Sequence, residues 1–280
     1  MPVISYLATY PVKSLKGIQL NAATLTPQGL AFDRRWMIID ENNRFVTQRK
    51  YSQMVLIHTE INQQRLVLSR PDSGLPPIEL AIQGTAAGDP FDAIIWKDTC
   101  RVVAENDAVN DWITRAIGSP RPLRLIRLQD GKQRPQSKPD LMGADIHTHF
   151  ADAAPFLVCN EASLDAVNDK LRESGLGPVT MERFRPNIVI RGLEAFAEHG
   201  TKGISHGDYQ LDFSYPCQRC VMPTIDPARG VRDASNQPFS LLADINAMPD
   251  NPKAPAFGEN AVLGRGNSGT IRVGDLVDAI

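Results

Sequence analysis

Two cysteines three positions apart, Cys217 and Cys220, are the residues of this chain whose types and spacing point most directly to chemistry. Such a pair is typical of metal or redox sites. A structural zinc site needs two further ligands at a similar spacing, and the other two cysteines are isolated in the sequence. A thioredoxin-like pair opens a helix, which Pro223 disfavours here. The pattern leaves one thiolate that binds a soft metal or acts as a nucleophile, and Arg219 beside Cys220 favours the thiolate form.

A basic turn lies near the start of the chain, at residues 10–17 (Tyr-Pro-Val-Lys-Ser-Leu-Lys-Gly). A proline and a glycine bracket two lysines and a serine. Lys13 and Ser14 can offer an ammonium group, a hydroxyl and backbone N–H groups to an anion. Taken alone, a solvated basic turn is the commoner explanation of such a segment.

Arginines precede two of the predicted strands. Arg34 and Arg35 follow Asp33 at the start of one strand, where alternation directs the two side chains to opposite faces. A surface ion pair with Asp33 is the simpler interpretation. Arg185 and Asn187 flank Pro186, which stiffens the entry to another strand. A guanidinium beside a carboxamide suits a phosphate or the edge of a polar heterocycle, and a plain strand-entry turn explains the segment equally well.

The elements that must position these residues are mostly short strands. Spacing near ten residues with turn signals between predicts a small barrel or a strongly bent sheet in the first hundred residues. A helix capped by Asn106 or Asp107 follows and ends at Gly118. The strands are predicted at 3–10, 35–40, 44–47, 54–59, 65–69, 78–82, 93–96 and 100–103.

The second half is predicted to be mixed. Asn160 caps a helix that ends at Gly175, and residues 240–247 form a second, short helix. Residues 129–143 are rich in Gly, Pro and Lys and read as a long, mobile loop, and residues 248–266 also read as loop. Strands are predicted at 123–128, 187–191 and 209–213, with a closing hairpin-like pair at 270–273 and 276–280.

Composition limits the class of protein. The 280 residues are 42% hydrophobic and 22% charged with a net charge of -2, as in an ordinary globular protein. No global basic character points to nucleic acid. No apolar run is long enough for a membrane helix, no secretory signal opens the chain, and four cysteines favour a reduced, cytoplasmic setting. We therefore expect a mainly β fold with a few helices (α+β), in two domains at residues 1–120 and 121–280.

The motifs, taken in order, resemble one family. They are Tyr-Pro-Val-Lys-Ser, Asp-Arg-x-Trp, Phe-Arg-Pro-Asn-Ile-Val-Ile, Cys-x-Arg-Cys-x-x-x-Thr-x-Asp-Pro and a terminal Arg-Val-Gly-Asp. Together they look like the MOSC proteins that carry an N-terminal MOSC β-barrel domain, the branch that includes the mitochondrial amidoxime-reducing components and their bacterial relatives. The resemblance covers essentially the whole chain and implies a β-barrel-like domain followed by a MOSC β-barrel domain.

The resemblance also implies a molybdopterin-type cofactor whose molybdenum is bound by one protein cysteine. By position that cysteine is Cys220, and Cys217 is not a ligand. The implied contacts to the cofactor's phosphate and pterin are made by Lys13, Ser14, Arg34, Arg185 and Asn187, with Gln218 beside the metal cysteine. Where the family carries a hydroxyl pair before Pro-Phe, this chain has Ala153 and Ala154, so hydroxyl contacts are lost there.

Two functions follow from the resemblance. The first is reduction of N-hydroxylated compounds such as amidoximes, hydroxylamines and N-hydroxylated bases, with electrons from a separate ferredoxin- or flavin-type reductase, because this chain lacks the cysteine-rich ferredoxin domain of some bacterial relatives. The second is a molybdenum-cofactor carrier or sulfur-transfer module with Cys220 as the sulfur carrier. Pyridoxal phosphate binding is associated with the family as a whole, but this chain has no aminotransferase-like region that would use it. An interaction subunit with a decayed site is disfavoured by the intact motif residues.

Overall fold

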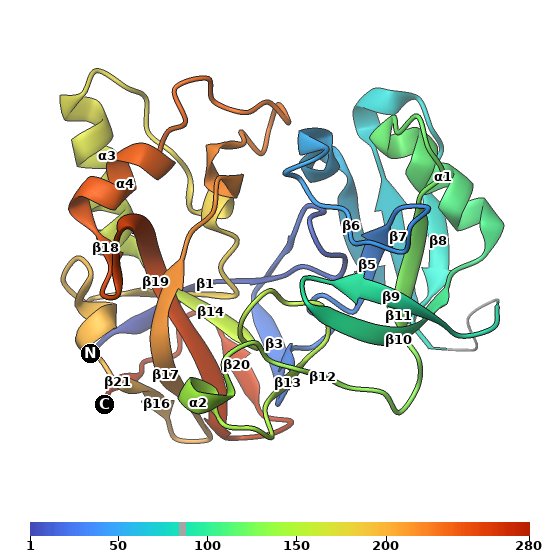
Figure 1. The fold of residues 1–280 in the computed structure, drawn as a ribbon. Coiled ribbons are helices and arrows are strands. Elements are labelled where there is room, and N and C mark those ends of the chain that lie inside the picture. The colour runs from blue at the N-terminus through green and yellow to red at the C-terminus, as the bar shows by residue number, and fades with distance from the viewer. Residues whose placement is uncertain (84–87) are drawn as a thin grey trace.

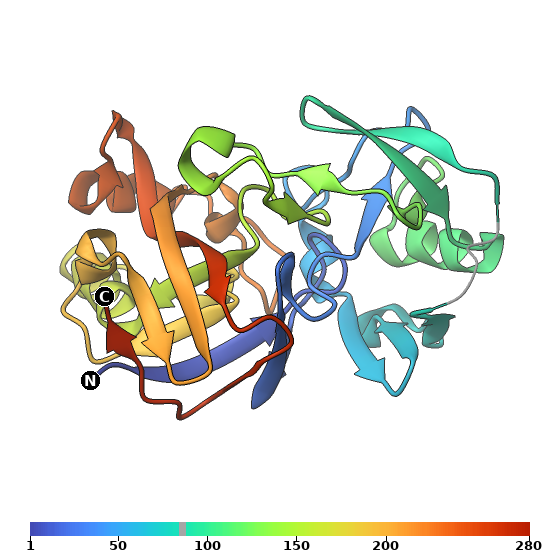
Figure 2. The ribbon, with the colours of Figure 1, turned by 90° about the horizontal axis from the view of Figure 1, so that it is seen from below.

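A computed structural model describes residues 1–83 and 88–280, and it shows two lobes joined side by side (Figure 1). Strands dominate both lobes, and the described residues contain four α-helices. The expected mainly β, α+β class is confirmed. Figure 2 shows the same two lobes from below, with the segment that joins them running between.

The first lobe is built on a nine-stranded sheet. Its central strand β14 pairs in parallel with β15 and antiparallel with β19. The first strand of the chain, β1, pairs antiparallel with β15, so the N-terminus belongs to the same sheet as the C-terminal strands. The order along the sheet is β2 (Ile18–Leu20), β1 (Val3–Thr9), β15 (Ile188–Arg191), β14 (Phe156–Asn160), β19 (Asn251–Arg265), β17 (Tyr209–Gln218), β16 (Gly203–His206) and β21 (Asp278–Ala279), with β18 (Ala247–Met248) paired to β19.

The second lobe combines two smaller sheets and a helix. β11 lies between β5 and β10 in a four-stranded sheet, and Trp36 and Ile38 from β5 pack against Trp112 and Ile113 of α1 in a shared core. The four-stranded sheet is β5 (Trp36–Ile39), β11 (Arg124–Leu128), β10 (Asp98–Ala104) and β9 (Phe91–Ile95), and the three-stranded sheet is β6 (His58–Asn62), β7 (Arg65–Ser69) and β8 (Ile78–Ala81).

Smaller elements complete the chain. β3 pairs with β20 on one side and with β4 on the other, and α3 and α4 lie at the upper end of the first lobe in Figure 1. They are β3 (Ala22–Thr26), β4 (Gly29–Leu30), β20 (Thr270–Arg272), β12 (Arg134–Pro135), β13 (His147–Thr148), α1 (Asp107–Ile117), α2 (Pro139–Met142), α3 (Glu161–Glu173), α4 (Phe239–Ile245) and five 3-10 helices, Ser52–Leu56, Pro71–Ser73, Met181–Phe184, Ala197–Gly200 and Met222–Thr224.

The predicted helix caps are confirmed for the two longer helices. The Asn106 side chain accepts a hydrogen bond from Val109 N, and Gly118 ends α1 with φ 71°. The Asn160 side chain accepts from Ala162 N at the start of α3. In both helices an Asn satisfies a backbone N–H that has no partner within the helix.

The prediction of a loop at residues 248–266 is wrong, because β19 occupies most of it and is the longest strand in the described part of the chain. Pro252, Pro255 and Gly258 have the composition of a loop, yet β19 is hydrogen-bonded to β14 on one side and to β17 on the other. Register shifts along β17 and β19 absorb residues that an ideal ladder would reject. Tertiary pairing thus overrides the local turn preference.

Other local predictions also need correction. Residues 129–143 are not a structureless loop, since they contain β12 and α2, and Arg134 is buried with its guanidinium paired to Asp98. The strand expected at 54–59 begins as a 3-10 helix, and the segment 44–47 contacts β5 through a single bridge. The two C-terminal segments pair with β3 and β16 rather than with each other.

No single boundary in the sequence separates the residues of the two lobes. β1 belongs to the sheet of the first lobe, while β11 belongs to the second lobe. The division at residues 1–120 and 121–280 stays a prediction, and hydrogen-bonded sheets cross it in both directions.

Gly258 offers a test of how β19 is packed. Its φ is +75°, and a Cβ built there lies 2.6 Å from both Cys159 Sγ and Val158 O. We expect Gly258→Ala to lower the free energy of unfolding by about 3 kcal/mol, since it combines backbone strain with overpacking. Urea unfolding measures this. Gly207→Ala, where a Cβ meets nothing within 4 Å, is the matched control, and equal losses in the two variants would contradict the packing described.

Candidate functional site

One cavity brings together all seven residues that the sequence predicted to bind the cofactor or the metal. Five basic side chains and a single acidic one line it, so its electrostatic character is strongly positive. The predicted residues in its wall are Lys13, Ser14, Arg34, Arg185, Asn187, Gln218 and Cys220. Further polar residues in the wall are Asp152, Arg183, Cys217, Arg219 and Asn260.

The nine-stranded sheet explains why residues so distant in sequence meet. β1 ends just before Tyr10, and its antiparallel neighbour β15 begins just after Asn187. Neighbouring antiparallel strands place the end of one beside the beginning of the other. Gln218 ends β17, two strands beyond β14, and Cys220 follows it in the next turn. The cavity therefore lies at one end of this sheet.

Three residues of the cavity have left-handed backbones. Ser14, Arg34 and Arg185 have φ of 69°, 47° and 55°. In residues other than glycine this conformation costs free energy, and it persists only where the surrounding structure fixes it. At each of the three positions the side chain lies in the cavity wall, so the surrounding structure holds these wall residues in a strained backbone conformation.

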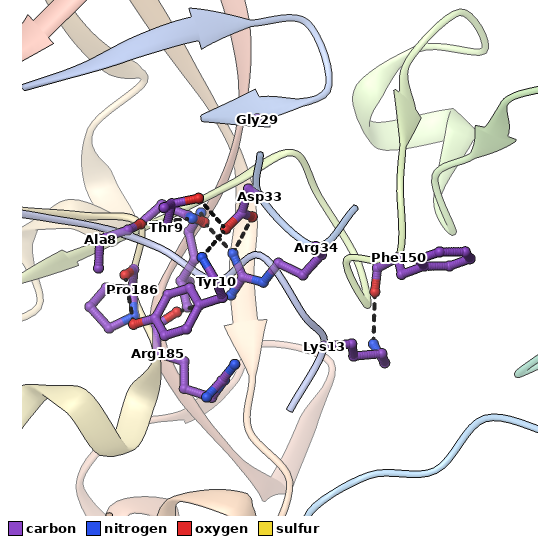
Figure 3. Close-up of polar contacts among 12 residues, drawn as sticks. Ala8, Thr9, Tyr10, Lys13, Gly29, Asp33, Arg34, Phe150, Arg185 and Pro186 are labelled. Atoms are coloured by element: carbon purple, nitrogen blue, oxygen red, sulfur yellow. Dashed lines mark hydrogen bonds and ion pairs between the residues drawn. The ribbon is translucent and has the colours of Figure 1, made fainter. Parts of the chain in front are cut away.

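Two partly buried arginines share one aromatic ring. The guanidinium carbons of Arg34 and Arg185 lie 4.4 Å and 4.2 Å from the centre of the Tyr10 ring. The Tyr10 hydroxyl donates to Pro186 O at 3.0 Å, which fixes the ring beside Arg185 (Figure 3). Cation–π contact with a buried ring stabilises each charge. Tyr10 thus brings two like charges to adjacent positions.

Hydrogen bonds orient Arg34 further. Its guanidinium is paired with the carboxylate of Asp33 and donates to Asn187 Oδ1 at 2.9 Å and to Arg185 O at 3.2 Å. The ion pair with Asp33 was expected at the surface, but Asp33 is 3% exposed and also accepts from Tyr10 N. Asn187 in turn accepts from Leu157 N, so its amide positions Arg34 within the wall.

Arg185 remains a cation despite its surroundings. Its guanidinium donates to Leu15 O at 2.7 Å. Burial lowers the pKa of Arg185 to about 10, an effect that the Tyr10 side chain partly opposes and the nearby Arg34 charge reinforces. The side chain is therefore still protonated at neutral pH and can neutralise an anion.

Lys13 is a further cation of the cavity wall, and it is buried. Its ammonium group donates to Phe150 O at 2.9 Å and to Asp152 Oδ1 at 2.6 Å. Burial lowers the pKa of Lys13, and the Asp152 carboxylate opposes that change. The neighbouring protein atoms partly desolvate the half-exposed Asp152 side chain, which would raise its pKa, but the Lys13 charge and hydrogen bond outweigh this and lower the pKa to about 2.

The two cysteines of the cavity differ in their surroundings. Cys220 is exposed, whereas Cys217 is half-buried and accepts a hydrogen bond from Arg219 Nη1 at 3.1 Å. The Arg219 guanidinium makes its hydrogen bonds to Cys217 and to Phe184 O, and it also interacts electrostatically with Cys220, so the expected influence of Arg219 on Cys220 stays a prediction. Arg219 Nε is buried without a hydrogen-bond partner.

Cys220 belongs to no multi-residue ligand set in the described part of the chain. No group of three or more His, Cys, Asp or Glu residues with metal-binding geometry occurs at residues 1–83 or 88–280. Ala153 and Ala154 line the cavity in place of hydroxyl residues, as the sequence implied. Cys217 and Cys220 are the two thiols in the cavity wall.

Sequence reasoning missed three residues that the site depends on. They are Tyr10, which opens the Tyr-Pro-Val-Lys-Ser motif, Asp152, which directly precedes Ala153 and Ala154, and Arg183, which lies two residues before Arg185. The proline after Tyr10 and the acid before Ala153 were the available signals. Neither signal reveals that Tyr10 contacts Arg185 or that Asp152 contacts Lys13, since each pair is more than a hundred residues apart in the sequence.

The chain matches the MOSC N-terminal beta barrel domain over residues 1–120 and the MOSC domain over residues 145–278. Mitochondrial amidoxime-reducing component 1 of Homo sapiens is 32% identical over 294 residues, covering 98% of this chain and 82% of that protein. The chain belongs to the MOSC-domain family that includes the mitochondrial amidoxime-reducing components.

A second relative and one solved structure match this chain less completely or less closely in sequence. Molybdenum cofactor sulfurase of Drosophila erecta is 33% identical over 240 residues, covering 82% of this chain and 29% of that protein. The crystal structure of the YUAD protein from Bacillus subtilis covers 99% of this chain and 94% of its own at 10% identity, with a TM-score of 0.40. Within the described residues of this MOSC protein, no helix has the length and apolar character to cross a bilayer.

The cation–π contacts of Tyr10 with Arg34 and Arg185 predict that removing the ring weakens anion binding. We expect Tyr10→Leu to weaken the binding of inorganic phosphate about tenfold, because Arg34 and Arg185 lose their common cation–π partner. Tyr10→Phe keeps the ring and should bind phosphate within about twofold of the wild type. Isothermal titration calorimetry measures both. Equal losses in the two variants would show that the ring itself does not position the arginines.

Burial predicts the order in which the cysteines react. We expect iodoacetamide to label exposed Cys220 first and half-buried Cys217 more slowly, while Cys100 and Cys159 stay protected until the protein unfolds. Burial also raises the pKa of the Cys159 thiol well above its usual value. Peptide mass spectrometry over time gives the order. Labelling of Cys159 as fast as Cys220 in the folded protein would contradict it.

Proposed function

We propose that this protein binds a molybdopterin-type cofactor, with Cys220 as the protein ligand of molybdenum, and that it reduces N-hydroxylated compounds. The observation that carries the proposal is the meeting of five basic side chains and one exposed thiol in a single cavity. Such a cofactor presents a phosphate dianion, which basic side chains can bind, and a soft metal, which a thiolate can bind.

The basic side chains suit the phosphate end. Arg34 and Arg185 already have fixed orientations, so little side-chain freedom is lost when an anion binds. Lys13 adds a buried ammonium group, and Ser14, with its left-handed backbone, adds a hydroxyl to the wall. Phosphate contacts of this kind are charge-assisted and strong. The unpartnered Nε of Arg219 is a further buried donor in the same wall.

Cys220 suits the metal end. Cys220 is exposed and lines the cavity, whereas the Cys217 sulfur already accepts a hydrogen bond from Arg219. Gln218, the last residue of β17, lines the same cavity, which supports a contact with the cofactor near the metal. The bound group supplies two-electron oxygen-atom chemistry, in which R–NHOH, two electrons and two protons give R–NH2 and water. The electrons come from a separate ferredoxin- or flavin-type reductase.

A second candidate function is that of a cofactor carrier or sulfur-transfer module with Cys220 as the sulfur carrier. The similarity to a molybdenum cofactor sulfurase favours it, as does the presence of two thiols in one cavity. In that case the sulfur is delivered by another protein. The stoichiometry of bound molybdenum distinguishes the two functions, because a sulfur carrier needs no stable metal on Cys220.

The test is to express the protein in a host that makes molybdopterin and to measure bound metal by mass spectrometry. We expect about one molybdenum per chain, lost in Cys220→Ala and retained in the matched variant Cys217→Ala. The wild type and Cys217→Ala should reduce benzamidoxime when a chemical electron donor is supplied. Metal-free wild-type protein from such a host, or loss of metal in Cys217→Ala alone, would contradict the proposal.

A further inference from the structure

The single acidic side chain in the cavity wall, Asp152, forms an ion pair with the single lysine there, Lys13. Asp152 Oδ1 lies 2.6 Å from Lys13 Nζ, and Lys13 is 4% exposed. The side chain of Asp152 is half-exposed, with a relative accessibility of 53%. A carboxylate in this position takes the place that an anionic ligand of Lys13 would need.

The same carboxylate oxygen accepts a second hydrogen bond. Trp96 Nε1 donates to Asp152 Oδ1 at 2.8 Å. Trp96 lies in the turn between β9 and β10, in the second lobe, and is 44% exposed. Asp152 therefore links a buried cation of the cavity to an exposed aromatic side chain of the other lobe.

Trp96 is held tightly for an exposed residue. Its φ of 53° is an outlier for a bulky side chain and persists only where the surroundings fix it. The Arg49 guanidinium lies 4.5 Å from the centre of its ring, and the Phe45 ring centre lies 5.0 Å away. Of these contacts, the bond to Asp152 alone depends on a group in the cavity wall.

We propose that Asp152 is a positioning residue that competes with phosphate for Lys13 and that moves away from Trp96 when phosphate binds. An incoming phosphate dianion pairs with the Lys13 ammonium group and repels the Asp152 carboxylate. Because Asp152 is half-exposed, it can turn toward water at little cost. Trp96 then loses its acceptor. The inference rests on the proposed role of Lys13 as a phosphate ligand.

Tryptophan fluorescence reports this movement selectively. Trp36 and Trp112 are 0% and 6% exposed, so acrylamide quenches mainly Trp96. The experiment titrates cofactor-free full-length protein with inorganic phosphate, follows emission and acrylamide quenching, and measures bound phosphate independently by 31P NMR. We expect quenching to rise in step with phosphate occupancy. Sodium chloride at matched ionic strength should leave it unchanged.

Two variants test whether Asp152 couples phosphate binding at Lys13 to Trp96 or only supports the local structure. In Asp152→Asn the competing charge is gone, so phosphate should bind about fivefold more tightly and Trp96 emission should no longer respond. Trp96→Phe should bind phosphate like the wild type and lose the fluorescence response. Asp152→Ala provides a second charge-free variant if the amide perturbs folding, as judged by circular dichroism.

The outcomes are distinguishable. Phosphate that binds without any change in Trp96 emission overturns the link while leaving the phosphate role of Lys13 intact. Unchanged phosphate affinity in both charge-free variants overturns the competition. Absence of phosphate binding by 31P NMR contradicts the role of Lys13 in the proposed function and, with it, the inference.

Discussion

The site depends on keeping two guanidinium groups charged and close together inside a protein wall. Arg34 and Arg185 repel each other, and burial lowers the pKa of Arg185 to about 10. Tyr10 between them and the carboxylate of Asp33 offset this cost. Buried cations arranged in this way are stable only with such partners, and they gain most when an anion binds them.

The antiparallel pairing of β1 with β15 is the structural condition for this arrangement. It places Tyr10, which follows β1, beside Arg185 and Asn187, which precede β15. The strained backbones of Arg34 and Arg185 then aim both side chains at the cavity. Cys220 reaches the same cavity from the end of β17, so the basic side chains and the exposed thiol come from different parts of the chain.

The sequence was most informative where local chemistry decides structure. The caps at Asn106 and Asn160 follow from unpaired helix N–H groups, and the cavity residues were found because their motifs resemble a family. β19 could not be predicted, since its prolines and glycines oppose a strand until β14 and β17 pair with it. Likewise, the contact of Arg219 with Cys217 rather than Cys220 depends on side-chain direction, which spacing does not specify.

The central claim is that Cys220 gives the metal its one protein sulfur. X-ray absorption spectroscopy at the molybdenum edge tests it most directly, on protein loaded in cells and on Cys220→Ser and Cys217→Ser. The account predicts the two cofactor dithiolene sulfurs plus one protein sulfur around molybdenum in the wild type and in Cys217→Ser, and one sulfur fewer in Cys220→Ser. An unchanged sulfur count in Cys220→Ser that still binds molybdenum, or a loss in Cys217→Ser, would contradict it.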